Sequence, residues 1–265
     1  MKYNVVADYV ADLQSKGRYT FTRDEAQKAL SLSGLALKRS LERLFSKKKS
    51  IVLVHRGFYI IVPLEYRARG ILPPEWFIRE LMQFMNLDYY VGLLSAAAIH
   101  GAAHQQPQEF HVVIPRFQRD IRIGNLSIRF FKKAHLLSTL VIETKTSTGF
   151  VRVSDPASTA IDLVAYEARI GGLSRVVTVL QELAESLKAE AVVRAAATEK
   201  NIAPVQRLGY LLEKIGQASL ASSLEEWISS RHTRPAPLQP GTSRKGSLRN
   251  PKWNILVNTD LEGDL

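Results

Sequence analysis

Apolar residues recur at helical spacing in three consecutive stretches near the start of the chain. The first stretch, NVVADYVADLQSKG, has one apolar face, and Gly17 follows it as a C-terminal stop. The second, FTRDEAQKALSLSG, places Thr22 and Glu25 at the spacing of a capping box. A break at residues 31–34 separates it from the third, LALKRSLERLFSKK. A short helix, a tight turn and a longer helix predict a helix-turn-helix.

The third predicted helix has two chemically different faces. Its apolar face is expected in the core and consists of Leu37, Leu41, Leu44 and Phe45. At about 100° per residue, Arg39 and Arg43 lie on the opposite side, with Ala36 near them. Arginine pairs bidentately with guanine or grips a phosphate, so this pattern is typical of a recognition helix. An ordinary solvated face is the alternative.

Two short strands follow in SIVLVHRGFYIIVP, over residues 51–54 and 58–62, joined by a turn at HRG. Strands in this place, with His55 and Arg56 at the turn, predict the wing of a winged helix-turn-helix domain over residues 1–67. The wing's basic residues are expected to reach DNA phosphates and the helix to read bases. The predicted DNA-binding residues are Ser33, Ala36, Lys38, Arg39, Arg43, Lys47, Lys48, Lys49 and Arg56.

Charge is concentrated in the same region. The chain carries a formal net charge of +11 over 265 residues. Residues 1–70 hold 14 Lys and Arg against six Asp and Glu, a net of +8, which leaves 22 minus 19, or +3, for the remainder. Basic charge gathered at one end indicates a polyanionic partner, most often nucleic acid, with a merely solubilising surface as the alternative.

Beyond a Gly- and Pro-containing junction at residues 68–74, we predict a larger α+β domain over residues 75–265. Helical patterns in PEWFIRELMQFM and YVGLLSAAAIHG precede strands in FHVVIP, RDIRIGNLSIRFF, TLVIET and GFVRV. Asp155-Pro156 predicts the start of a helical region. Residues 232–251 are rich in Pro, Gly and Ser and are expected to be a linker, and KWNILVN a final strand.

Gly124-Asn125 suits a two-residue hairpin turn. That register pairs Ile121 with Ile128 on a buried face and Arg122 with Ser127 on a charged one, which implies a half-exposed sheet. This stretch carries a second cluster of cations, which we consider as a possible secondary DNA surface. Its members are Arg116, Arg119, Arg122, Arg129, Lys132 and Lys133.

Signs of enzymatic chemistry are weak. With no cysteine, thiolate chemistry and zinc fingers are excluded. His100 and His104 have ligand spacing, but Gly101 interrupts the helix, so no metal site and no cofactor is expected. Asp120 with Glu143 and Lys145 leaves open an alternative Mg²⁺-dependent nuclease. A transcription factor that senses a small ligand is a second alternative.

No apolar run approaches the roughly 20 residues of a membrane-spanning helix, and MKYNVVADYVADLQ does not have the pattern of a secretory signal. We therefore expect a cytoplasmic protein without a membrane partner.

Several segments together resemble the AbiEi family of abortive-infection antitoxins and transcriptional regulators. They are RGFYIIVP, YYVGLLSAAAIHGAAHQQP, FHVVIPR, GFVRVSDPASTAIDLV and KWNILVNTDLEGD. The resemblance implies a non-enzymatic repressor that binds inverted repeats in its own promoter. It also implies an antitoxin in a phage-defence system, acting against a nucleotidyltransferase-like toxin without requiring a stable complex with it. DNA contact is carried over only to the third helix and wing.

Overall fold

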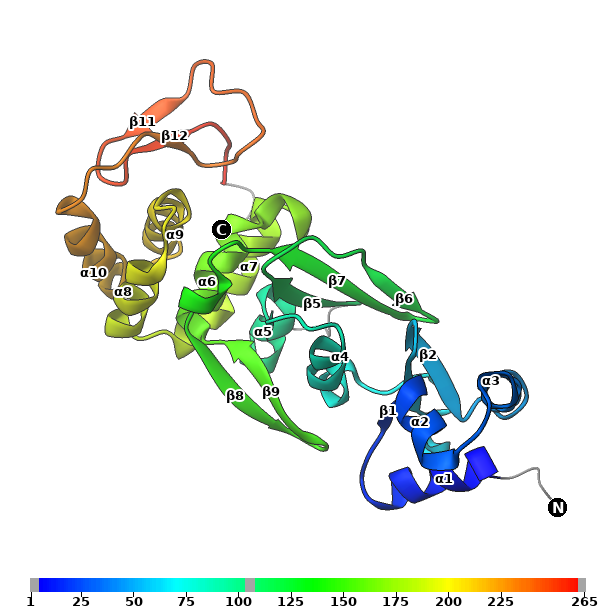
Figure 1. Cartoon of the computed structure of the whole chain (residues 1–265). Helices are drawn as coiled ribbons and strands as arrows, with labels where there is room; N and C mark the ends of the chain where they lie inside the picture. Colours follow the sequence, from blue (N-terminus) through cyan, green and yellow to red (C-terminus); the bar gives the residue numbers. More distant parts are fainter. Residues whose placement is uncertain (1–4, 103–107, 262–265) are drawn as a thin grey trace.

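The computed structural model describes residues 5–102 and 108–261, without the side chains of Lys47 and Lys48. It is a mixed α/β structure in which an N-terminal unit, residues 5–61, lies at one end (Figure 1). The elements of this unit are α1 (Val5–Ser15), β1 (Thr20–Thr22), α2 (Arg23–Leu30), α3 (Gly34–Arg43), the π-helical η1 (Leu44–Lys48), β2 (Ile51–His55) and β3 (Phe58–Ile61).

The start of α2 confirms the capping box. Thr22 Oγ1 accepts a hydrogen bond from Glu25 N at 3.1 Å, and Glu25 Oε2 accepts one from Thr22 N at 3.4 Å. The strand β1, which the apolar pattern did not indicate, pairs antiparallel with β3, so the hairpin becomes a sheet of order β1-β3-β2. The strand β1 has only three residues, which are too few to show the alternation of apolar and polar positions that identifies a strand in a sequence.

The prediction for Phe45 was wrong. Leu37, Leu41 and Leu44 are buried as expected, but Phe45 is 51% exposed. The helix changes at Leu44 from α to the wider π form, in which each residue advances by a smaller angle. Residues beyond Leu44 are therefore rotated away from the register that the α-helical period assigns them.

A six-stranded mixed sheet of order β6-β7-β5-β4-β9-β8 forms the centre of the rest of the chain. Its strands are β4 (Tyr90–Val91), β5 (Glu109–Ile114), β6 (Ile121–Ile123), β7 (Leu126–Lys132), β8 (Val141–Thr146) and β9 (Gly149–Ser154). The predicted hairpin is confirmed, with Ile121 opposite Ile128 and Arg122 opposite Ser127. The strands β5 and β7 run parallel, as do β4 and β9.

Both faces of the central strands are covered, whereas the β6–β7 hairpin has the one buried face that we expected, with Ile121 and Ile128 buried and Arg122 exposed. Because side chains alternate along a strand, Val113 and Phe131 join one core and Val112 and Phe130 the other. The first core contains the helices α5 (Leu93–Ile99), α6 (Pro156–Ala165), α7 (Leu173–Leu183), α8 (Ala189–Thr198), α9 (Ala203–Lys214) and α10 (Ala218–Ser229). Asp155 caps α6 as predicted, since its Oδ1 accepts from Ser158 N at 2.7 Å.

The second core joins the large sheet to the N-terminal unit. It contains α4 (Ile78–Phe84), the buried Ile71 and Leu72 of the junction, and Val54, Phe58 and Ile60 of the β2–β3 hairpin. The hairpin is thus covered by α-helices on one side and by the rest of the chain on the other. Short 3₁₀ turns connect the elements: η2 (Leu64–Tyr66), η3 (Pro74–Trp76), η4 (Leu136–Ser138), η5 (Glu167–Arg169) and η6 (Ala184–Ser186).

A small sheet of order β10-β12-β11 closes the described chain, and Figure 1 shows it beside α9. Its strands are β10 (Ala236–Pro237), β11 (Leu248–Asn250) and β12 (Ile255–Val257). Residues 232–251, expected as a linker, therefore contribute two strands and the fully buried Leu238. Within the described residues, no helix has the length and apolar character needed to cross a membrane.

Candidate nucleic-acid interface

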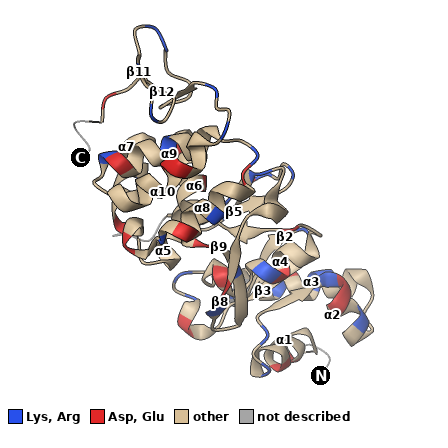
Figure 2. Cartoon of the chain, turned by 90° about the vertical axis from the view of Figure 1, so that its left-hand side faces the viewer, with Lys and Arg blue, Asp and Glu red and all other residues tan. Residues whose placement is uncertain are grey.

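The helix α3 separates a buried apolar face from an exposed polar one. Ser33 caps its start, where Ser33 Oγ accepts a hydrogen bond from Ala36 N at 3.3 Å. Leu37 and Leu41 are 0% and 3% exposed, whereas the residues predicted to face DNA lie at the surface. These exposed residues are Ser33, Ala36, Lys38, Arg39 and Arg43. Figure 2 shows Lys and Arg on α3, within the N-terminal unit.

Three further residues belong to this surface, and the sequence pattern did not assign them to it. Leu35 is 60% exposed and Phe45 51% exposed, so α3 and η1 present apolar side chains beside the cations. Arg23 is exposed at the start of α2, and its Nη2 lies 3.4 Å from where a Cβ on Gly34 would stand. In the sequence, only the position of Leu35 and Phe45 close to the predicted arginines could have indicated that they belong to this surface. Helical spacing alone assigned Phe45 to the core.

The turn between β2 and β3 is fixed at both ends. Arg23 N donates to Gly57 O at 2.8 Å, which ties the turn to α2. Arg56 is exposed, as predicted. His55, by contrast, is half-buried, and its ring centroid lies 6.0 Å from that of Phe84 in α4. The hairpin is therefore packed against α4 on the side of His55.

Lys49 follows η1 with a left-handed backbone (φ 48°) and an exposed side chain. Lys47 and Lys48 are helical in η1, and their side chains lie outside the described part of the chain.

The second cluster of cations divides into two groups. Arg116, Arg119, Arg122 and Lys132 are exposed. Arg129 instead donates to Glu109 Oε2 at 2.8 Å and to Arg169 O at 3.2 Å. Lys133 is 13% exposed and joins the polar network described next. The prediction that all six form one surface therefore fails for Arg129 and Lys133, whose charges are neutralised by nearby carboxylates.

Lys133 is the centre of a buried polar network between β7 and the helices. Its Nζ lies 2.9 Å from Asp162 Oδ1 and 2.7 Å from Glu199 Oε1. Tyr90 donates its hydroxyl proton to Asp162 Oδ2 at 2.6 Å. Burial lowers the pKa of Lys133, but Asp162 and Glu199 outweigh it and raise the pKa above its ordinary value. Burial, followed by the charge of Asp162, raises the pKa of Tyr90 well above 10.

The residues of the nuclease alternative are not brought together. Asp120 precedes β6 and Glu143 and Lys145 lie on β8, and these strands form opposite edges of the six-stranded sheet. Asp120 Oδ1 accepts from Phe130 N at 2.9 Å, and Glu143 Oε1 lies 3.8 Å from Arg79 Nη1. A shared Mg²⁺ requires carboxylate oxygens within about 2 Å of one ion, so this constellation holds none.

The metal alternative also lacks a ligand set in the described residues. His100 Nε2 lies 2.8 Å from Ser154 O, a contact that makes His100 structural, while His104 lies outside the described residues. Residues 5–102 and 108–261 contain no group of three His, Cys, Asp or Glu able to hold an ion.

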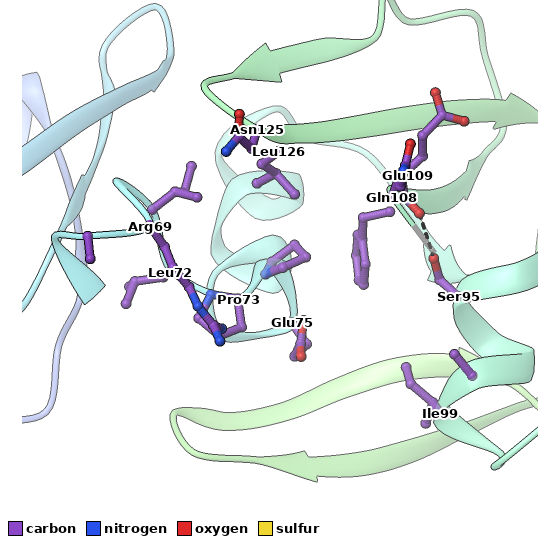
Figure 3. A pocket seen from close by; sticks show the side chains of 15 residues that line it. Arg69, Leu72, Pro73, Glu75, Ser95, Ile99, Gln108, Glu109, Asn125 and Leu126 are labelled. Carbon is purple, nitrogen blue, oxygen red and sulfur yellow. Dashed lines mark hydrogen bonds between the residues drawn. The ribbon is translucent and has the colours of Figure 1, made fainter. Parts of the chain in front are cut away.

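A cavity of about 720 Å³ lies between the junction, the α5–β5 region and the β6–β7 turn (Figure 3). Its wall combines apolar side chains with Arg69, Glu75 and Asn125, and Ser95 Oγ donates to Glu109 O at 3.4 Å there. Burial raises the pKa of Glu75. Mixed chemistry of this kind suits a small molecule, so this cavity is where the ligand-sensing alternative would place its effector.

Comparisons with known proteins bear on the whole chain and on its centre. The crystal structure of the RV2827C protein from Mycobacterium tuberculosis is similar in fold, with a TM-score of 0.68 at 16% identity, over 96% of this chain and 91% of that one. No curated protein sequence matches. Residues 90–214 match the family described as the AbiEi antitoxin C-terminal domain. These residues include β4 to α9, hence the large sheet and the Lys133 network. Residues 90–214 of this chain thus form a domain of the AbiEi antitoxin C-terminal family.

Proposed function

We propose that the chain binds its own promoter as a winged helix-turn-helix repressor and is the antitoxin of a nucleotidyltransferase-like toxin. The N-terminal unit would recognise inverted repeats in double-stranded DNA, and the remainder would counteract the toxin. The observation that carries the DNA-binding part is the exposed face of α3, where Arg39 and Arg43 stand opposite the buried Leu37 and Leu41.

Physical chemistry favours DNA for this face. Its cations neutralise phosphates, which gives affinity that falls with salt, whereas arginine forks at α3 supply base choice. The hairpin beside α3 is held by the Arg23–Gly57 backbone bond, so Arg56 is presented from a fixed turn. A rigid frame lowers the entropic cost of docking several contacts at once.

Fluorescence anisotropy with the protein's own upstream duplex and a scrambled duplex, over a salt series, tests this part. The double variant Arg39→Ala/Arg43→Ala should lose preference for the native duplex, since each bidentate arginine–guanine pair contributes about 1–3 kcal/mol. A matched control, Arg194→Ala/Arg244→Ala, removes the same charge from exposed sites elsewhere. A folded Arg39→Ala/Arg43→Ala protein with unchanged selectivity would refute the assignment.

The antitoxin part follows from the family and is tested separately. The chain and the toxin encoded beside it are co-expressed from an external promoter, so that autoregulation plays no role. The Arg39→Ala/Arg43→Ala variant should still restore growth, whereas a variant with a disrupted Lys133 network should not. Loss of rescue in the α3 variant at equal protein level would contradict this division of labour.

A further inference from the structure

A second cavity, of about 370 Å³, opens beyond the carboxyl ends of the parallel strands β5 and β7. Ile114 and Lys132, the last residues of these strands, both line it. The crevice outside the carboxyl ends of parallel strands is a frequent place for ligands in open sheets, and the volume lies in the range of small-molecule sites. The residues that define its chemistry are Arg116, Phe117, Arg119, Phe130, Lys132 and Arg169.

Positive charge dominates this cavity. Four cations line it, and none of Arg116, Arg119 and Lys132 forms an ion pair with a carboxylate among the described residues. The one acidic residue, Asp120, accepts from Phe130 N and lies 3.9 Å from Arg129 Nε. The carboxylate of Asp120 thus interacts with the backbone of β7 and with Arg129 rather than with the cations that line the cavity. The remaining cations suit a ligand with several negative charges.

Arg169 is held in place before any ligand arrives. Its Nη2 donates to Phe130 O at 3.2 Å, and its guanidinium carbon lies 4.3 Å from the centroid of the Phe131 ring. Tyr166 donates its hydroxyl proton to Lys132 O at 2.6 Å, which fixes the end of β7 beneath the cavity. A cation oriented in this way loses little conformational entropy on binding, so the site is preorganised for an anion.

Phe117 adds an aromatic surface to the anion site. Its side chain is 78% exposed although it lies between Arg116 and Arg119, while Phe130 forms a 4% exposed wall of the same cavity. An aromatic ring kept in water beside arginines matches a ligand with a flat ring and phosphate groups, because bases stack on aromatic side chains and phosphates pair with arginine.

We propose that this cavity binds a nucleoside phosphate, with its phosphates between Arg116, Arg119, Lys132 and Arg169 and its base against Phe117. The site is separate from the DNA-binding face. Lys132 O is bonded to Tyr166 at the end of α6, and Figure 1 shows α6 and α7 on the side of the sheet away from α3. The inference therefore holds whether or not α3 reads an operator.

Isothermal titration calorimetry of the full chain tests the proposal with each of the four ribonucleoside triphosphates, inorganic pyrophosphate and a scrambled duplex. At least one triphosphate should bind saturably and more tightly than pyrophosphate. Arg116→Ala/Arg119→Ala should weaken it at least tenfold, whereas Arg122→Ala, an exposed arginine on β6 outside the cavity, should leave it unchanged. Phe117→Ala should weaken the triphosphate several-fold without affecting pyrophosphate.

Three results would overturn the proposal. The first is the absence of saturable binding by any triphosphate. The second is equal binding of triphosphate and pyrophosphate with no effect of Phe117→Ala, which would reduce the cavity to an anion site. The third is an Arg116→Ala/Arg119→Ala protein that loses duplex affinity and has unaltered triphosphate binding, which would assign these arginines to DNA. Equal melting temperatures of the variants control for folding.

Discussion

Phe58 of the β2–β3 hairpin and Phe84 of α4 pack with their ring centroids 5.4 Å apart, across the boundary between the N-terminal unit and the rest of the chain. Phe84 also contacts the ring of His55, and its Cζ lies 3.6 Å from where a Cβ on Gly57 would stand. One aromatic side chain thus touches both strands of the hairpin and its turn. The position of the hairpin depends on α4.

Replacing Phe84 with alanine should loosen this contact. Since Phe84 is 39% exposed, we expect the free energy of unfolding to fall by about 1–2 kcal/mol, less than for a fully buried phenylalanine. If the chain binds its promoter as proposed, affinity for that DNA should fall by a few-fold, because the hairpin is no longer held. Urea denaturation and anisotropy measure the two effects. Leu137→Ala, at a 74% exposed leucine, is the control, and equal effects of both variants would contradict the prediction.

Replacing Lys133 with alanine should strongly destabilise the protein. Asp162, which is 1% exposed, and Glu199 would then be left close together without their cation. Removing one partner of a buried ion pair costs about 3–5 kcal/mol. The adjacent exposed Lys132, the last residue of β7, provides a matched control, since Lys132→Ala removes the same charge from the neighbouring position. Denaturation midpoints that coincide for the two variants would show that the network adds no stability.

Acid should destabilise the protein through His111, which is 1% exposed on β5. Burial lowers its pKa to about 4; Glu109 opposes this, while Arg129 and Arg175 add to it. The neutral form is favoured in the folded state, so between pH 6.5 and 4 the unfolded state binds more protons. This contribution is therefore complete above about pH 6.5 and is lost as pH falls towards 4, at a cost of roughly 3 kcal/mol.

Urea denaturation from pH 4.5 to 8 measures this loss. The variant His111→Gln should be less stable at pH 8 but show a flatter dependence below pH 6.5. Exposed His135, changed to glutamine, should keep the wild-type slope. If His111→Gln keeps that slope too, another group is responsible for the acid sensitivity.

Gly209→Ala should reverse the usual effect of this substitution in a helix. Alanine normally stabilises a helix interior by up to about 1 kcal/mol relative to glycine. At Gly209 in α9, however, a Cβ would stand 2.0 Å from Cζ3 of the fully buried Trp253. We expect a loss of about 1–3 kcal/mol from overpacking, measured by urea denaturation.

Tryptophan fluorescence should report displacement of Trp253 and with it of the C-terminal sheet. Gly34→Ala is the matched control, because a Cβ there meets only the flexible end of Arg23, at 3.4 Å. Stabilisation by Gly209→Ala would contradict the packing described.

Local signals in the sequence predicted local structure well. The capping box at Thr22, the start of α6 at Asp155 and the register around Gly124-Asn125 each depend on residues within a few positions of one another. Such patterns identify an element whatever lies around it. The helical pattern in YVGLLSAAAIHG likewise predicted α5, although its first residues form β4 rather than helix.

Long-range relations could not be predicted in this way. The two residues of β4 become a central strand only because β5 and β9, distant in the chain, pair with them. Lys132 and Lys133 are adjacent and chemically identical, so the sequence does not indicate which of them is buried. Only the fold brings Lys133 into contact with Asp162. The same holds for the candidate interface: the sequence supplied Arg39 and Arg43, but not the contact of His55 with α4.

The shared core of the hairpin and the large sheet also affects synthesis and turnover. Val54, Phe58 and Ile60 share their core with Ile71 and Leu72 of the junction, with α4 and with the large sheet, so their covering depends on chain that is made after the N-terminal unit. A chain cut in the junction at residues 68–74 would expose those three side chains to water. Partial degradation would therefore yield an aggregation-prone fragment rather than a free N-terminal unit, and the proposed promoter control and antitoxin activity would be lost together.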